Sequence, residues 1–258
     1  MKIFFKIMIF AAVVAFFASC DSARQDAASP DFNSGGGTGK SGSMARFTIA
    51  FNKLYIVDES SLRIFDVSNA AKPVFESKIE MRSGVETIFA YGSNLFFGTT
   101  SGMDIYSIAN PSAPMYLSTY THITGCDPVV VQGNFAYVTL RGGRACGNAP
   151  NVLDIIDVSE LRNPRIMRSV PMQSPYGLGI DGNVLFVCEG AAGFKTFTLP
   201  DPTNPALASQ ISNHDAYDLI LHNNTAMVVG KNGLFQYSYK NSLTNPEVTF
   251  LSKIPVGI

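Results

Sequence analysis

The feature that most constrains this chain is a unit of about 41 residues that occurs five times. Each copy has two apolar runs around a turn, then a short strand that ends in a turn and a proline. The turns centre on Lys53, Asn94, Asn134, Asn183 and Asn224, and the prolines are Pro73, Pro114, Pro164, Pro205 and Pro246. The prolines step by 41, 50, 41 and 41 residues and the turns by 41, 40, 49 and 41. Two landmarks sharing one period, with one extension in the third copy, predict an all-β fold, a five-bladed β-propeller of four-stranded antiparallel blades.

The blades are expected at about 44–82, 83–124, 125–173, 174–215 and 216–256. In the second copy, the four predicted strands are 86–91, 95–100, 103–108 and 115–120. The fourth strand begins at or just after a proline, which an outer edge strand tolerates because it needs no inward N–H. Neither end of the repeat region has a strand to lend, so we expect blade 5 to pack directly on blade 1. The alternative to the whole assignment is a β-sandwich with accidental spacing.

Composition fits one well-buried domain and disfavours nucleic acid as a partner. The 258 residues are 46% hydrophobic and 15% charged, and the net charge is −1. Such a chain has no broad positive field to attract phosphate backbones.

The N-terminus has the pattern of a secretory signal over residues 1–19. Lys2 and Lys6 precede an apolar run that is too short to span a bilayer of roughly 30 Å. Phe17-Ala18-Ser19-Cys20 resembles the lipobox of bacterial lipoproteins, although Phe17 stands where Leu is usual, so ordinary signal-peptide cleavage is the alternative. Lipidation of Cys20 would anchor the protein to a membrane, which we expect to be the outer membrane of a bacterial cell envelope. Residues 20–43, rich in Ser and Gly, are expected to form a flexible tether.

Two of the short strands carry a recognisable motif. The segments Leu62-Arg63-Ile64-Phe65-Asp66-Val67-Ser68 and Leu153-Asp154-Ile155-Ile156-Asp157-Val158-Ser159 resemble the LVIVD repeat family, which is common in lipoproteins of Bacteroidetes. The resemblance extends over about residues 46–254, but copies two, four and five have Ser107, Thr198 and Ser238 where the family has aspartate. It implies a propeller and export, and no defined activity.

Propeller topology brings certain loops to one rim. The connections from the fourth strand to the next blade, and from the second strand to the third, open on the same face, where binding sites collect on variable loops. The only sizeable insertion, Arg141–Pro150, is such a loop. Cys126 and Cys146 share this rim, so export predicts a disulfide that closes a loop of about 20 residues and contributes roughly 3 kcal/mol. Separate free thiols are the alternative, and Cys188 is the competing or leftover thiol.

The same rim gathers polar and aromatic side chains suited to a sugar or an extended peptide. The candidate ligand-binding residues are Arg141, Arg144, Glu86, Asp127, Tyr176, Glu189, Tyr217 and Asp218. The alternative is that these charges only solvate the rim.

We find no nucleophile motif, no cofactor motif and no metal-ligand spacing, and the three histidines are scattered, with His214 expected as an exposed polar residue. The sequence therefore predicts a non-catalytic binding or scaffold module for a protein or glycan. The alternatives are a carbohydrate-active enzyme that uses two rim carboxylates, for instance Asp127 and Glu189, or a subunit of an envelope complex.

Overall fold

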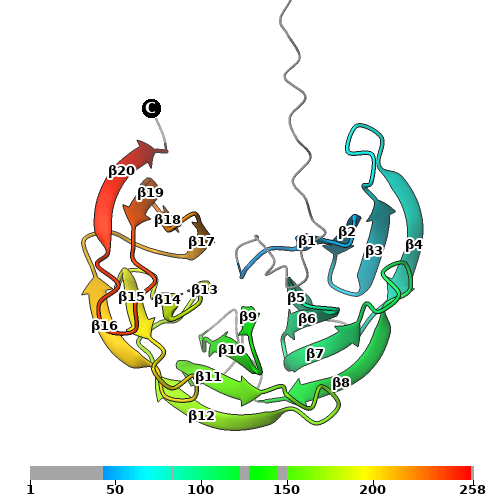
Figure 1. Ribbon diagram of the computed structural model, residues 1–258, viewed down its shortest axis with the longest axis horizontal. Helices are drawn as coiled ribbons and strands as arrows, with labels where there is room; N and C mark the ends of the chain where they lie inside the picture. The colour runs from blue at the N-terminus through cyan, green and yellow to red at the C-terminus, as the bar shows by residue number, and fades with distance from the viewer. Residues whose placement is uncertain (1–42, 83, 123–127, 144–149, 257–258) are drawn as a thin grey trace, which may run out of the picture. The chain divides into compact units, whose positions relative to one another are not determined.

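The computed structural model describes residues 43–82, 84–122, 128–143 and 150–256. The predicted signal, Cys20, Cys126, Asp127, Arg144 and Cys146 lie outside these ranges. Blades 1 and 2 are the first two sheets along the chain (Figure 1). Blade 1 comprises β1 (Phe47–Ala50), β2 (Lys53–Val57), β3 (Ser61–Asp66) and β4 (Val74–Glu80). Blade 2 comprises β5 (Val85–Tyr91), β6 (Asn94–Thr99), β7 (Gly102–Ser107) and β8 (Met115–Thr121).

Blades 3, 4 and 5 repeat the same plan. Blade 3 comprises β9 (Val129–Gln132), β10 (Phe135–Leu140), β11 (Val152–Asp157) and β12 (Arg165–Pro171). Blade 4 comprises β13 (Leu178–Asp181), β14 (Val184–Cys188), β15 (Phe194–Thr198) and β16 (Ala206–Ile211). Blade 5 comprises β17 (Asp218–His222), β18 (Thr225–Gly230), β19 (Gly233–Ser238) and β20 (Thr249–Pro255).

The predicted fold class is confirmed. Each of the five sheets has four strands in chain order, and every neighbouring pair is antiparallel. In blade 2, the four predicted strands agree with β5–β8 within one residue at each end. The outer strands are the most exposed ones: every residue of β20 is exposed, and β12 is almost as open.

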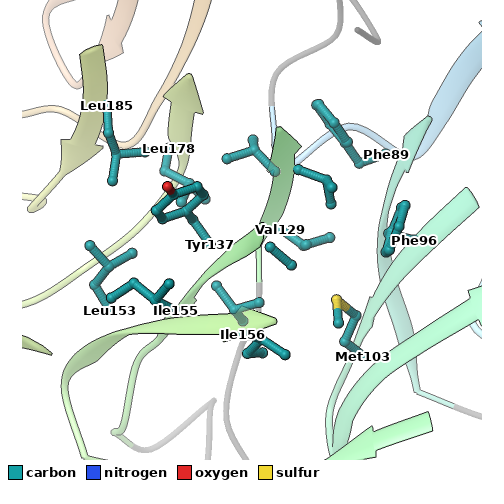
Figure 2. Packing of buried hydrophobic residues seen from close by; sticks show 14 of the residues in the cluster. Phe89, Phe96, Met103, Val129, Tyr137, Leu153, Ile155, Ile156, Leu178 and Leu185 are labelled. Atoms are coloured by element: carbon teal, nitrogen blue, oxygen red, sulfur yellow. The ribbon is translucent and has the colours of Figure 1, made fainter. Parts of the chain in front are cut away.

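The core consists of layers between neighbouring blades. Phe89, Phe96 and Met103 of blade 2 and Leu178 and Leu185 of blade 4 enclose the apolar residues of blade 3 in one buried cluster (Figure 2). A second cluster joins blades 1 and 2, and a third joins blades 4 and 5. The near-continuous apolar runs of the first two strands arise because a blade inside the row buries both of its faces.

Polar bonds reinforce the junctions between blades. Tyr55 Oη donates to the carbonyl oxygen of Pro111 at 2.8 Å, and Tyr137 Oη donates to that of Pro202 at 3.0 Å. Each tyrosine lies on the second strand of its blade and reaches the turn between the third and fourth strands of the next blade. These bonds satisfy hydroxyls that packing would otherwise leave buried and unpaired.

The aspartates of the LVIVD-like motif stabilise turns. Asp66 Oδ1 accepts a hydrogen bond from the Ser68 backbone N–H at 2.9 Å, and Asp157 Oδ1 accepts one from Ser159 N–H at 2.8 Å. Such side-chain bonds to the backbone two residues ahead favour a turn over a longer strand. The motif thus ends its strand and directs the chain toward the outer edge.

Blades 1 and 5 are the two ends of the row of blades (Figure 1). The inner strands contact one another in the order β1, β5, β9, β13 and β17, and among the described strands no contact of that extent joins β17 to β1. The expectation that blade 5 packs directly on blade 1 is therefore not met in the described part of the chain. Instead, the residue at the start of blade 1, Ser43, turns inward: its Oγ accepts from Leu178 N–H at 2.7 Å and lies 3.4 Å from Asp218 Oδ1.

Across the described ranges, the structure contains no helix with the length and apolar character needed to cross a membrane.

Candidate functional site

Three neighbouring blades bring their loops together at the predicted rim. The loop before β13 carries Tyr176, the loop before β17 carries Tyr217, and Arg141 begins the loop between β10 and β11. One backbone bond fixes the loop of Tyr176 to its own blade, since Tyr176 N–H donates to Cys188 O on β14 at 2.8 Å. A second joins it to the loop of Tyr217, since Gly177 N–H donates to Tyr217 O at 2.9 Å. The rim is thus held by backbone bonds and does not depend on side chains alone.

The main contact in the site is between Arg141 and two tyrosine rings, those of Tyr176 and Tyr217. The guanidinium carbon of Arg141 lies 4.0 Å from the centroid of the Tyr176 ring, within the range of a cation–π interaction. The Tyr176 and Tyr217 rings meet edge to face, with centroids 5.2 Å apart and an interplanar angle of 72°. We name Arg141, Tyr176 and Tyr217 the rim cluster.

Local backbone features hold Tyr176 in this place. Its carbonyl oxygen accepts a bond of 2.6 Å from Thr139 Oγ1 on β10. Gly190 lies against the ring with φ of +55°, and a Cβ there would lie 2.6 Å from Tyr176 Cε2. A glycine at position 190 therefore allows both the left-handed turn and the close approach of the ring.

Asp218 is the first residue of β17 and follows Tyr217 of the rim cluster in the chain. Its Oδ1 accepts from Ser43 Oγ. Burial raises the pKa of this carboxyl to about 6, while bonds from Leu219, Ser43 and Met44 oppose the rise. The residue before it, Tyr217, has its hydroxyl 3.4 Å from Asp215 Oδ2. The site therefore combines a cation, two phenol rings and, beside Tyr217, a carboxyl whose pKa is raised by burial.

Glu189 occupies a structural position below the rim. It is fully buried, and its Oε1 accepts a bond of 2.7 Å from Gln173 N–H. Its Oε2 lies 2.7 Å from Lys195 Nζ, outside hydrogen-bond angles, so the attraction is that of an ion pair. This carboxylate joins the loop before blade 4 to strand β15, and it is not presented to solvent.

The remaining predicted residues are placed only in part. Glu86 lies half-buried on β5 in blade 2. Asp127 and Arg144 lie outside the described residues, as do Cys126 and Cys146, so their disulfide stays a prediction. Cys188 is a free, fully buried thiol at the end of β14, and burial, followed by the charge of Asp218, raises its pKa well above the usual range.

Two residues near the site behave differently from the sequence-based expectation. Ser43, assigned by composition to the end of the tether, is fully buried. His214 is half-buried and stacks on Phe235 at 3.7 Å, with Nε2 2.7 Å from Tyr237 Oη. A serine in a Ser/Gly run gives no signal of burial, whereas the apolar residues around His214 belong to a different strand and become neighbours only in the fold.

The described residues offer no ready metal site. No three His, Cys, Asp or Glu side chains within those ranges are grouped so that they could hold a metal ion.

Comparison with solved structures agrees with the fold. A functionally unknown protein from Desulfotomaculum acetoxidans is 11% identical over 80% of this chain and 68% of that one, with a TM-score of 0.66. A periplasmic gluconolactonase of Pseudomonas aeruginosa is 14% identical over 80% and 68%, with a TM-score of 0.63. The computationally designed protein Ika8 is 10% identical over 81% and 60%, with a TM-score of 0.57. The chain thus spans 60–68% of the length of these structures, and the likeness concerns the fold alone.

Sequence comparison adds the repeat. No curated protein matches the chain. The LVIVD repeat matches residues 49–80 and 126–171, which contain most of blade 1 and of blade 3. The protein is therefore a five-bladed β-propeller whose first and third blades match the LVIVD repeat.

Proposed function

We propose that the protein is a non-catalytic binding module of the cell envelope that takes a carboxylate-bearing ligand, an acidic glycan or an acidic peptide, at the rim cluster. The observation that carries this proposal is the Arg141 guanidinium at 4.0 Å over the Tyr176 ring. Stacking fixes a long side chain in advance, so less conformational entropy is lost when its N–H groups bind a ligand.

The chemistry around Arg141 suits such a ligand. A planar guanidinium presents a fork of donors that matches a carboxylate, and the adjoining tyrosines add apolar area with polar hydroxyls. Among the described residues no ion pair involves Arg141. Arg141 is also only partly buried, which leaves its side chain within reach of solvent.

The first experiment measures binding by the full chain to an array of acidic and neutral glycans and to peptides captured from cell envelopes. We expect Arg141→Ala to weaken binding by at least about tenfold, the loss of one charge-assisted contact. Arg141→Lys should also weaken binding, because a lysine ammonium neither stacks on the Tyr176 ring nor donates two parallel hydrogen bonds to a carboxylate.

Arg165→Ala is the matched control, because Arg165 is an exposed arginine at the start of β12, beside the turn between the third and fourth strands of blade 3. Equal effects of Arg141→Ala and Arg165→Ala would show that net charge, and not the rim cluster, governs binding. If the wild-type protein binds only acidic glycans or only acidic peptides, that result identifies which of the two supplies the carboxylate.

The anchor is proposed from the N-terminal sequence. Phe17-Ala18-Ser19-Cys20 supports lipidation of Cys20 and attachment to the outer membrane. Labelling of growing cells with radioactive palmitate should mark the protein and should not mark the Cys20→Ala variant. Label in both would reject the anchor.

The alternative proposal is an enzyme, and it is supported by the likeness in fold to a gluconolactonase. Hydrolysis of gluconolactone by the wild-type chain, abolished by Arg141→Ala or Asp218→Asn, would favour it over the binding module. A subunit role in an envelope complex would appear as protein captured equally by wild type and Arg141→Ala.

A further inference from the structure

One side of blade 1 is apolar and uncovered. Phe47 is paired with Ile56, Ile49 with Leu54, and Leu54 with Phe65 across β1, β2 and β3, so these five side chains share one side of the sheet. Phe47 is 55% exposed and Ile56 is 36% exposed. We name these five residues the leading face of blade 1.

One side of blade 5 is also apolar and uncovered. Ile220 is paired with Met227, and Val229 with Leu234, which in turn is paired with Ile254. Val229 is 47% exposed and Ile254 is 57% exposed. We name Ile220, Met227, Val229, Leu234 and Ile254 the trailing face of blade 5.

The repeat shows what the leading face normally contacts. The hairpin of the first two strands closes with Ala50 paired to Lys53 in blade 1 and with Tyr91 paired to Asn94 in blade 2. Aligning these hairpins makes Phe47 and Ile56 equivalent to Ile88 and Phe97. Both equivalents are fully buried against blade 1. The leading face is thus the surface that receives a preceding blade.

The trailing face is the other half of the same junction. In blade 5 the corresponding hairpin closes with His222 paired to Thr225, so Met227 and Val229 are equivalent to Tyr55 and Val57 of blade 1. Those two residues are buried against blade 2. The trailing face is therefore the surface on which a following blade packs.

We propose that the trailing face of blade 5 in one copy of the protein packs on the leading face of blade 1 in a second copy, continuing between chains the junction that joins blades within a chain. The chain carries both halves of this junction, and in the described structure β17 and β1 do not contact each other as the other inner strands do. Contiguous exposed apolar surface is characteristic of interfaces. The contact is head-to-tail, so a pair closes only if both junctions form and otherwise the chains assemble in series.

The test uses the full chain in mild detergent and measures its mass by light scattering over a hundredfold range of concentration. We expect the wild type to form dimers or larger assemblies as the concentration rises. Ile56→Glu and Val229→Glu should each be monomeric. Every junction between two chains uses one leading face and one trailing face, so either substitution places a charge in all of them. Leu207→Glu, on the outer strand β16, adds the same charge elsewhere and should assemble like the wild type.

Mixing the two variants gives the sharpest result. The trailing face of Ile56→Glu and the leading face of Val229→Glu are both intact, so a 1:1 mixture should form dimers and nothing larger. Ile56→Ser and Val229→Ser repeat the experiment with smaller, neutral side chains if a glutamate disturbs folding.

Three outcomes would overturn the proposal. They are a wild type that stays monomeric at all concentrations, variants that assemble like the wild type, or a mixture of the two glutamate variants that stays monomeric. The first would mean that the faces are covered within one chain, for instance by residues 1–42, or by a different partner.

Discussion

Asp218 shows how one residue couples the inner rim of the propeller to pH. Its carboxyl is desolvated between β17 and the segment at Ser43, and its pKa rises to about 6 from an ordinary value of 3.8. Because the folded state binds this proton more tightly than the unfolded state, its contribution to stability is complete below pH 4. That contribution is lost as the pH rises through 6.

Asp218→Asn should therefore remove a pH dependence. Asparagine keeps an acceptor for Ser43 and Met44 but cannot ionise. Relative to wild type, we expect the free energy of unfolding of the variant to rise by about 1–2 kcal/mol between pH 4 and pH 7, because only wild type loses stability as Asp218 ionises. Urea denaturation at pH 4, 5, 6 and 7 measures this difference.

Asp157→Asn is the matched control because the sign is reversed there. Hydrogen bonds from Ser159 lower the pKa of Asp157, so its contribution to stability is present above the unfolded pKa. The Asp157→Asn variant should lose stability relative to wild type as the pH rises. A difference for Asp218→Asn that does not change with pH would contradict the buried, titrating carboxyl.

At the level of single residues, the sequence predicts which loops share a rim but not which atoms meet there. Connectivity assigns Arg141, Tyr176 and Tyr217 to one face. It does not predict the stacking of Arg141 on Tyr176, which depends on Gly190 and Thr139 in separate elements. The burial of Glu189 was not predictable either, because a polar residue at the end of a strand has the same sequence pattern whether it faces solvent or pairs with a lysine inside the fold.

An ion pair between Glu189 and Lys195 stabilises the β14–β15 hairpin of blade 4. Glu189 follows β14 and Lys195 lies on β15, where its side chain is only 16% exposed. A second contact of Glu189, a hydrogen bond from Gln173 N–H, connects the hairpin to the loop from blade 3. Glu189 therefore connects a hairpin, through its ion pair, and a loop, through its hydrogen bond, on either side of Tyr176.

Glu189→Gln should leave Lys195 without its counter-ion in a partly desolvated place. We expect the free energy of unfolding to fall by about 2–3 kcal/mol, somewhat less than for a fully buried pair. Denaturant titration at pH 7 measures the change. Glu80→Gln breaks the exposed pair of Lys78 with Glu80 and should cost less than about 1 kcal/mol. Equal small effects would show that the Glu189 pair is solvated.

Strands and turns were the most predictable elements of the chain. A proline directly precedes the outer strands β4, β8, β12 and β16, whereas β20 begins three residues after Pro246. The apolar runs mark strands that two blades bury. The sequence could not separate blades 1 and 5 from the others, because all five copies have apolar first and second strands. Phe47 and Val229 are exposed because blades 1 and 5 each have a neighbouring blade on one side only. The sequence of a single repeat does not show whether its blade has one neighbour or two.

At the scale of the whole propeller, stability should differ between the middle and the ends. The inner strand β9 of blade 3 packs extensively on both β5 and β13, whereas β1 and β17 each pack extensively on one other inner strand among those described. Local opening needs least free energy where fewest buried contacts are lost. The blades should therefore open from the two ends of the row.

Hydrogen exchange measured by mass spectrometry tests this order and also the pairing of two chains. At low concentration, amides of β9 should exchange at least about tenfold more slowly than those of β1 and β17. At high concentration, a second copy should cover the leading and trailing faces, so protection should rise in β1 and β17 while β9 stays unchanged. Ile56→Glu should abolish that rise. Equal protection of all five inner strands at every concentration would instead mean that blade 5 and blade 1 close the ring within one chain.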